Sequence, residues 1–202
     1  MTVVKSKEAN KLAPERRTKT VGLIVGSLRE HSFNRIIAAA IPELDTSLAF
    51  EWIPLADLPL YNEDVDHGDG PEPVRRFREA INRVDGVIIV SPEYNSGIPG
   101  VLKNALDWAS TPAKTAALRG KPVGLVGATP GVKGTILSQQ QIRQTLEAIQ
   151  ARVLPFHKMY VSQVGDKVDA ERRTLTDDTT RKYLKRYVQQ FILWIDQARA
   201  LD

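Results

Sequence analysis

The chain has 202 residues, of which 42% are hydrophobic, enough for the core of one domain. It contains no cysteine, which excludes disulfides, thiolate metal sites, iron–sulfur clusters and a cysteine nucleophile. No apolar run approaches the roughly 20 residues that span a bilayer, and the N-terminus lacks the apolar core of a secretory signal. We therefore expect one cytoplasmic domain without a membrane span.

The formal net charge of +4 is concentrated in residues 1–19. This segment holds 6 basic and 2 acidic residues, and removing them from the totals of 28 and 24 leaves 22 residues of each sign. A neutral body has no basic surface for nucleic acid, so nucleic-acid binding is not expected. We expect residues 1–19 to be a basic, disordered extension and residues 20–202 to form the domain.

The first predicted strand, Thr20–Val25, is followed by a polar loop and an amphipathic helix with Ser32 in the N-cap position. The loop has the groups that a phosphate monoester requires. Ser27 and Ser32 offer hydroxyls, Asn34 an amide and Arg29 a guanidinium, beside the positive end of the helix dipole. Neither G-x-G-x-x-G nor the Walker motif is present, so a mononucleotide phosphate fits better than a pyrophosphate.

A second strand is predicted at residues 48–53, where Glu51 indicates an edge position. The long connection that follows contains Asp66, His67 and Asp69. These side chains invite a metal interpretation, but their spacing matches no calcium or zinc site, and a solvated loop is favoured. Pro71 and Pro73 then begin a helix whose apolar positions run to Val84.

The stretch from Gly86 to Trp108 is the most informative part of the chain. Val87–Val90 forms a short apolar run typical of a parallel strand buried on both faces. A loop punctuated by glycine and proline follows, and apolar residues then recur at helical spacing from Ile98 to Ala109. Trp108 fits either the core or a contact with a partner subunit.

The loop between this strand and helix carries a hydroxyl, a carboxylate, a phenol, an amide and a second hydroxyl, from Ser91, Glu93, Tyr94, Asn95 and Ser96. In an open α/β sheet, ligands bind outside the carboxyl ends of the strands. The residue types therefore favour a binding loop over a simple turn.

The rest of the chain continues the same alternation. We expect a strand at Pro122–Ala128, a glycine-rich loop at Thr129–Thr135, a helix to Ile149 and a short strand at Arg152–Pro155. An exposed, charged connection from Tyr160 leads to a helix that begins at Asp177 or Asp178. The apolar positions of the helix that runs to Ile149 are Ile136, Leu137, Ile142, Leu146 and Ile149. The last helix is predicted to bury Tyr183, Leu184, Tyr187, Val188, Phe191, Ile192 and Ile195.

Five strands alternating with five helices predict an α/β three-layer sandwich around a five-stranded parallel sheet. In the flavodoxin-like order 2-1-3-4-5, the switch point lies between the first and third strands. Those strands lead into the two polar loops. The topology therefore places Ser27–Asn34 beside Ser91–Gly97 as one composite site.

The residues that carry this site also resemble a known family. The motifs are Gly-Ser-Leu-Arg-x-x-Ser-Phe-Asn, Leu-Pro-Leu-Tyr-Asn-Glu-Asp and Ser-Pro-Glu-Tyr-Asn-Ser-Gly-Ile-Pro-Gly-Val-Leu-Lys-Asn-Ala-Leu-Asp-Trp. They resemble the NAD(P)H-dependent FMN reductase family of flavodoxin-like proteins, closest to its chromate and quinone reductase branch. The likeness runs from about Thr20 to the C-terminus.

The resemblance implies that Ser27, Arg29, Ser32 and Asn34 hold the FMN phosphate. It implies that the ribityl chain and ring are lined by Pro92, Glu93, Tyr94 and Asn95, with Ser96 and Gly97 near the ring edge. Thr129 would belong to the far side of the pocket, where the family more often has Ser. No catalytic acid or base and no metal ligand is implied, because the flavin accepts the hydride and passes it on.

The resemblance further implies bound FMN, NADPH or NADH as electron donor, and a small-molecule acceptor such as a quinone, chromate, an azo or a nitro compound. A homodimer or homotetramer is expected. The alternatives are a reductase that supplies free reduced FMN to a monooxygenase, a non-enzymatic flavodoxin-type electron carrier and a nucleotide-sensing binding protein. The neutral body argues against the electron carrier, which usually docks through an acidic face.

Overall fold

The structure is a computed structural model that describes residues 18–68 and 70–200. The predicted disordered extension falls outside these residues except for its last two positions. Of these, Lys19 forms an ion pair of 3.0 Å with Asp196 in the C-terminal helix. This ion pair joins Lys19 to the last helix of the domain.

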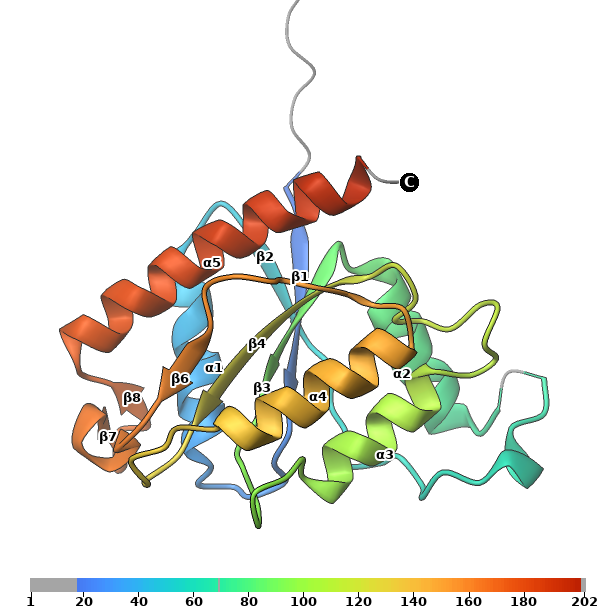
Figure 1. The fold of residues 1–202 in the computed structure, drawn as a ribbon, viewed down its shortest axis with the longest axis horizontal. Coiled ribbons are helices and arrows are strands. Elements are labelled where there is room, and N and C mark those ends of the chain that lie inside the picture. The colour runs from blue at the N-terminus through green and yellow to red at the C-terminus, as the bar shows by residue number, and fades with distance from the viewer. Residues whose placement is uncertain (1–17, 69, 201–202) are drawn as a thin grey trace, which may run out of the picture.

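A parallel sheet forms the centre of the molecule (Figure 1). Its order is β2-β1-β3-β4-β5, as predicted. The strands are β1 (Thr20–Val25), β2 (Ala49–Trp52), β3 (Gly86–Val90), β4 (Pro122–Ala128) and β5 (Arg152–Val153). β2 lies at the edge, in agreement with the expectation from Glu51. β5 is shorter than predicted, since only Arg152 and Val153 are in register with β4, although the N–H of Leu154 still donates to the carbonyl of Val123.

Helices cover both faces of the sheet and make the predicted three layers (Figure 1). They are α1 (Phe33–Leu44), α2 (Glu72–Arg83), α3 (Gly100–Ala109), α4 (Ile136–Ala148) and α5 (Asp178–Arg199). α1 and α5 pack on the face that carries Ile88 and Val90, and α2, α3 and α4 pack on the face that carries Val87 and Ile89. Alternate residues of one apolar strand thus serve two cores.

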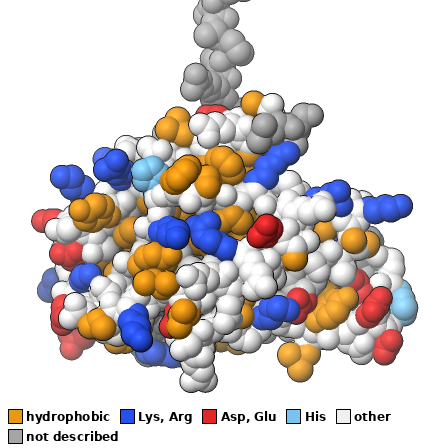
Figure 2. Space-filling model, viewed as in Figure 1, with side chains coloured by type: hydrophobic (Ala, Val, Ile, Leu, Met, Phe, Trp, Pro, Cys, Tyr) orange, Lys and Arg blue, Asp and Glu red, His pale blue; other side chains and the backbone are white. Residues whose placement is uncertain are grey.

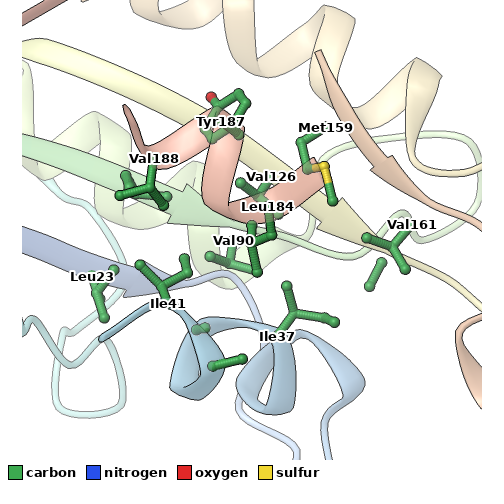
Figure 3. Packing of buried hydrophobic residues seen from close by; sticks show 14 of the residues in the cluster. Leu23, Ile37, Ile41, Val90, Val126, Met159, Val161, Leu184, Tyr187 and Val188 are labelled. Carbon is green, nitrogen blue, oxygen red and sulfur yellow. The ribbon is translucent and has the colours of Figure 1, made fainter. Parts of the chain in front are cut away.

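Figure 3 shows the core between α1 and α5, where Ile37 and Ile41 face Leu184 and Val188 across the side chains of the central strands. Asp177 caps α5 through a hydrogen bond of 2.6 Å from the Thr180 N–H to its carboxylate, which confirms the predicted start of that helix. Further along α5, Tyr183 was expected to be buried but is 59% exposed. Its side chain lies on the outer side of the first turns of α5.

The segment before α5 was predicted to be an exposed connection, and this was wrong in part. It contains β6 (Met159–Val161), which pairs with β4 as a sixth strand, the 3₁₀-helix η2 (Val164–Lys167) and the ribbon of β7 (Val168–Asp169) and β8 (Thr174–Leu175). Its apolar side chains are buried in the core that α1 and α5 share. Pieces of two to four residues are too short to produce a periodic pattern.

The outer edge of β4 is divided between two strands. β5 pairs with Pro122 and Val123, and β6 pairs with Val126 to Ala128. Between them the backbone N–H of Leu125 donates a hydrogen bond of 2.6 Å to the phenol oxygen of Tyr187. Burial raises the pKa of this phenol, so it stays neutral.

The connection between β2 and α2 includes the 3₁₀-helix η1 (Glu63–Val65) and is held against α3. The indole of Trp108 is fully buried and donates a hydrogen bond of 2.8 Å to the carbonyl of Pro59. Trp108 therefore belongs to the core.

Asp66, in the same connection, was expected in a solvated loop, but its carboxylate is buried in an ion pair of 2.9 Å with Arg78. The hydrogen bond that Arg78 donates within this pair holds the pKa of Asp66 below its usual value.

Candidate functional site

Three loops meet at the carboxyl edge of the sheet. In the register of the parallel strands, Val25 lies beside Val90 and Val90 lies beside Val126. Consequently the first loop (residues 26–32), the second loop (residues 91–99) and the third loop (residues 129–135) leave the sheet at neighbouring points. This confirms that the two polar loops singled out in the sequence lie next to each other.

Direct contacts join the first loop to the second. The hydroxyls of Ser27 and Tyr94 are 3.3 Å apart. A Cβ at Gly26 would lie only 2.5 Å from the hydroxyl of Ser91, so the close approach of the loops depends on a glycine. The two loops therefore form one surface.

The N-terminus of α1 presents unused hydrogen-bonding groups. Ser32 occupies the N-cap position without a side-chain capping bond, and the first turn contains no acidic residue. Within the described residues, the backbone N–H groups of Phe33 and Asn34 have no hydrogen-bond partner. Ser27 and Ser32 are each only 3% exposed. Buried hydroxyls beside free N–H groups at the positive end of a helix suit an anion such as a phosphate.

Arg29 lies at the rim of this anion site. Its side chain is exposed, and its guanidinium donates a hydrogen bond of 3.0 Å to the carbonyl of His31. The backbone N–H of Arg29 lies 3.3 Å from the hydroxyl of Ser27. Within the part of the chain that the structure describes, the other guanidinium N–H groups of Arg29 have no partner and can bind an anion in the first loop.

The side chain of Asn34 forms hydrogen bonds with the end of β4. Its amide nitrogen donates to the carbonyl of Ala128 at 2.8 Å, and its amide oxygen accepts from the N–H of Ala128 at 2.9 Å. The side chain is 2% exposed. Asn34 therefore fastens the start of α1 to the end of β4, and in this arrangement it positions the first loop.

The second loop forms a tight turn at its tip. Tyr94 and Gly97 exchange two backbone hydrogen bonds, of 3.1 and 3.0 Å. Asn95 and Ser96 have positive φ values of 50° and 61°, as the central residues of a type I′ turn do. Asn tolerates this conformation better than most residues, which explains its presence at the tip.

Glu93 does not extend into open space, because its carboxylate caps α4. One carboxylate oxygen accepts hydrogen bonds of 3.0 Å from the N–H groups of both Leu137 and Ser138. The hydroxyl of Ser138 donates to the carbonyl of Pro92 at 3.1 Å. The negative charge of Glu93 thus lies at the positive end of the α4 dipole.

Gln141 holds the other side of the same turn. Its side-chain oxygen accepts a hydrogen bond of 3.0 Å from the N–H of Ile98, and its side-chain nitrogen lies 3.4 Å from the carbonyl of Ser96. The sequence analysis missed both Ser138 and Gln141. Their spacing of three residues, which places them on one face of α4, is the signal that could have indicated them.

The third loop is anchored to β6. The N–H of Thr129 donates to the carbonyl of Val161 at 3.0 Å, and the Thr129 hydroxyl lies 3.3 Å from the N–H of Gly131. Thr135, also missed, is fully buried next to Gly127, where a Cβ would lie 1.9 Å from its hydroxyl. Thr129 therefore lies at the edge of the site with its hydroxyl used inside the loop.

Apolar side chains border the site on the side of the second and third loops. Tyr94 is 45% exposed, and Ile136 and Leu137 are 39% and 40% exposed. Ile136 and Leu137 occupy the first turn of α4. An anion site beside an apolar border fits a ligand with a phosphate at one end and a planar ring at the other, as FMN has.

Two further observations limit the chemistry of the described residues. Within residues 18–68 and 70–200, no group of three or more His, Asp or Glu side chains could hold a metal ion. In the same part of the chain, no helix is long and apolar enough to cross a membrane.

Comparison with known proteins agrees with this site. The family model described as NADPH-dependent FMN reductase matches residues 19–166. A quinone reductase from Pseudomonas putida is 38% identical over 183 residues, which are 90% of this chain and 97% of that protein. A 2-hydroxy-1,4-benzoquinone reductase from a Burkholderia species is 37% identical over 180 residues, 89% of this chain and 97% of that protein.

Among solved structures, this chain is similar to the flavoenzyme FerB, an NAD(P)H:(acceptor) oxidoreductase from Paracoccus denitrificans. The TM-score is 0.80 at 34% identity, and the match covers 89% of this chain and 98% of FerB. The family model spans the three site loops, and the relatives are matched over nearly their whole length. The chain therefore belongs to the NADPH-dependent FMN reductase family.

Proposed function

We propose that this protein is an FMN-dependent NAD(P)H oxidoreductase that reduces quinones by two electrons. The observation that carries the proposal is the anion site at the start of α1, with two buried hydroxyls and free N–H groups, next to the apolar border of the second loop. Relatives at 37–38% identity that are named quinone reductases support the choice of acceptor. Chromate, azo and nitro compounds are further candidate acceptors.

In this proposal the first loop binds the phosphate of FMN. Ser27, Ser32 and the first N–H groups of α1 hold the anion, and Arg29 adds a charged contact at the rim. Asn34 keeps these groups in place through its two hydrogen bonds to Ala128. The phosphate supplies affinity, while the reacting ring lies elsewhere.

The second loop positions the ring. Its Tyr94–Gly97 turn is stiffened by reciprocal backbone bonds, and Glu93 brings α4 against the loop. Bound FMN would supply the hydride-transfer chemistry between NAD(P)H and the quinone. The chain aligns donor and acceptor in turn, and no side chain need act as acid or base.

We also propose that the protein acts as a homodimer or homotetramer. The exposed side chains of Tyr94, Ile136 and Leu137 support this, because a neighbouring subunit that covers this apolar border would exclude water from the ring.

The test is an absorbance spectrum of the purified full chain, followed by anaerobic addition of NADPH. A flavin spectrum that persists through gel filtration and then bleaches with NADPH supports the proposal. Loss of the colour on the column would favour a reductase that releases FMN. A retained flavin that NADPH does not bleach would favour an electron carrier.

A further inference from the structure

A cavity of about 360 Å³ adjoins the candidate flavin site at the first loop, with which it shares Arg29 and Ser32. We call it the side cavity. It is enclosed by the first loop, α1, Trp52 of β2 and the turn between β7 and β8, and β8 packs against α1 (Figure 1). Its apolar wall is formed by Phe33, Ile36, Ala39, Trp52 and Ala170. The volume is typical of a small-molecule site.

Arginines give the side cavity a positive charge. Arg29, Arg35 and Arg173 line it together with a single carboxylate, that of Glu30. Glu30 already accepts a hydrogen bond of 3.1 Å from Arg173. Within the described residues, Arg35 forms no ion pair. The cavity therefore has more positive than negative charge and favours an anionic ligand.

The wall of the cavity favours a planar ring in the same ligand. Trp52 is 44% exposed, which leaves much of its indole available for stacking. Arginine side chains also stack on rings and bind phosphates with two N–H groups at once. An aromatic wall with arginines at its margin thus suits a phosphorylated nucleoside.

We propose that the side cavity binds the adenosine 2′-phosphate end of NADPH and makes the enzyme prefer NADPH to NADH. This inference rests on the proposed function. Three molecules take part in that reaction. FMN is proposed to occupy the three loops, and a simple quinone has no charge for the arginines to bind. The adenosine half of NADPH has both a planar ring and phosphates, so it matches the side cavity. Arginine instead of a free carboxylate beside the ribose is the arrangement that accommodates a 2′-phosphate. Arg29 and Ser32 belong to the first loop and also line the side cavity, so the side cavity adjoins the candidate FMN phosphate site.

The experiment is isothermal titration of the full chain, saturated with FMN, with adenosine 2′,5′-bisphosphate and with adenosine 5′-monophosphate. We expect the bisphosphate to bind about tenfold more tightly, because the 2′-phosphate gains charge-assisted contacts. Equal affinity for the two probes, or no binding of either, would overturn the inference.

Two substitutions test the arginines separately. Arg35→Gln and Arg173→Gln should each weaken the bisphosphate by about tenfold. Arg172→Gln is the matched control, because Arg172 lies in the same turn with its side chain 83% exposed and does not line the cavity. Circular dichroism verifies that each variant is folded. A loss of affinity in Arg172→Gln as large as in Arg173→Gln would show non-specific attraction and contradict the inference.

Trp52 gives an independent readout on the flavin-free full chain. Of the three tryptophans, only Trp52 lines the side cavity, whereas Trp108 is fully buried and Trp194 packs against the core, so ligand in the side cavity should quench the fluorescence of Trp52. The quenching should disappear in Trp52→Phe. Quenching that persists in this variant would place the ligand elsewhere and overturn the inference.

The outcomes separate this inference from the proposed function. If NADPH bleaches the bound flavin but the bisphosphate does not bind, the reductase activity stands and the side cavity is not its nucleotide site. If the bisphosphate quenches Trp52 but NADPH leaves the flavin oxidised, the cavity site stands and the reductase proposal fails. If the reductase activity and the nucleotide site in the side cavity are both confirmed, Arg35→Gln should raise the ratio of KM for NADPH to KM for NADH by about tenfold.

Discussion

The side-chain amide of Asn34 forms two hydrogen bonds with the backbone of Ala128, a residue 94 positions further along the chain. One bond runs from the amide nitrogen to the carbonyl, and the other runs from the backbone N–H to the amide oxygen. Because Asn34 belongs to the first turn of α1 and Ala128 ends β4, this pair fixes the first loop relative to the third.

Asn34→Ala should destabilise the protein by roughly 2–4 kcal/mol, since both buried backbone groups of Ala128 lose a partner. Urea unfolding followed by circular dichroism measures the effect. Asn82→Ala is the control, because Asn82 is exposed on α2 and its side chain makes no hydrogen bond within the described residues. If Asn34→Ala and Asn82→Ala lower the free energy of unfolding by the same amount, the hydrogen bonds between Asn34 and Ala128 do not stabilise the protein.

Glu93→Ala should lower the free energy of unfolding by about 1–2 kcal/mol, because the α4 N-terminus loses its cap and a favourable charge. FMN affinity, followed by flavin fluorescence, should fall as well, since the second loop loses its support from α4. Glu93→Gln should lose less, because its side-chain oxygen can still accept the bonds from Leu137 and Ser138.

Glu147→Ala is the matched control for Glu93, since it removes an exposed carboxylate from the same helix. It should change neither stability nor FMN affinity. Equal effects of Glu93→Ala and Glu147→Ala would show that the capping bonds contribute nothing.

Arg29→Ala should weaken FMN binding by roughly 1.5–3 kcal/mol, which is the range for a hydrogen bond to a charged group. Riboflavin, which lacks the phosphate, should bind the variant and the parent protein equally well. Titration of flavin fluorescence measures both. An unchanged affinity for FMN would mean that the phosphate lies away from the first loop.

The pair of Asp66 and Arg78 predicts how stability depends on pH. The hydrogen bond from Arg78 lowers the pKa of Asp66 from 3.8, so the unfolded chain binds the proton more readily than the folded protein. The stabilisation is complete above the unfolded pKa and disappears as pH falls through the lower pKa of the folded protein. Asp66→Asn should therefore be less stable than the parent near neutral pH.

The difference between the parent and Asp66→Asn should shrink below about pH 4, where Asp66 of the unfolded parent becomes protonated. Urea unfolding at a series of pH values measures this. A difference that stays constant down to the acid limit would rule out the contribution of the ion pair. Asp64→Asn, in the exposed neighbouring 3₁₀-helix, serves as control.

The sheet order and the location of the site could be predicted from the sequence because both depend on short-range patterns. Val87–Val90 and Pro122–Ala128 are apolar runs without interruption, and each leads into a polar or glycine-rich loop. Parallel topology then brings the loops together at one edge without further information. Two residues proposed to hold a phosphate are buried, Ser27 in the first loop and Ser32 at the N-cap of α1.

The direction of individual polar side chains could not be predicted in the same way. Glu93 follows β3, and Asn34 lies in the first turn of α1. The side chain of each forms hydrogen bonds with backbone groups that are more than 40 residues away in the sequence. Composition shows that a loop is rich in hydrogen-bonding groups. Which of them turn inward depends on long-range packing, since buried backbone groups at helix ends and strand ends need partners.

The division of β4's outer edge between β5 and β6 affects whether the sheets of two molecules can pair edge to edge. Strands of two and three residues occupy that edge, and Tyr187 takes the N–H between them, while the opposite border is the four-residue β2, whose Glu51 is paired with Arg83. Within residues 18–68 and 70–200, neither border offers a long, flat row of free amides to which a foreign strand could pair. Short and interrupted borders of this kind disfavour the edge-to-edge stacking of sheets from separate molecules.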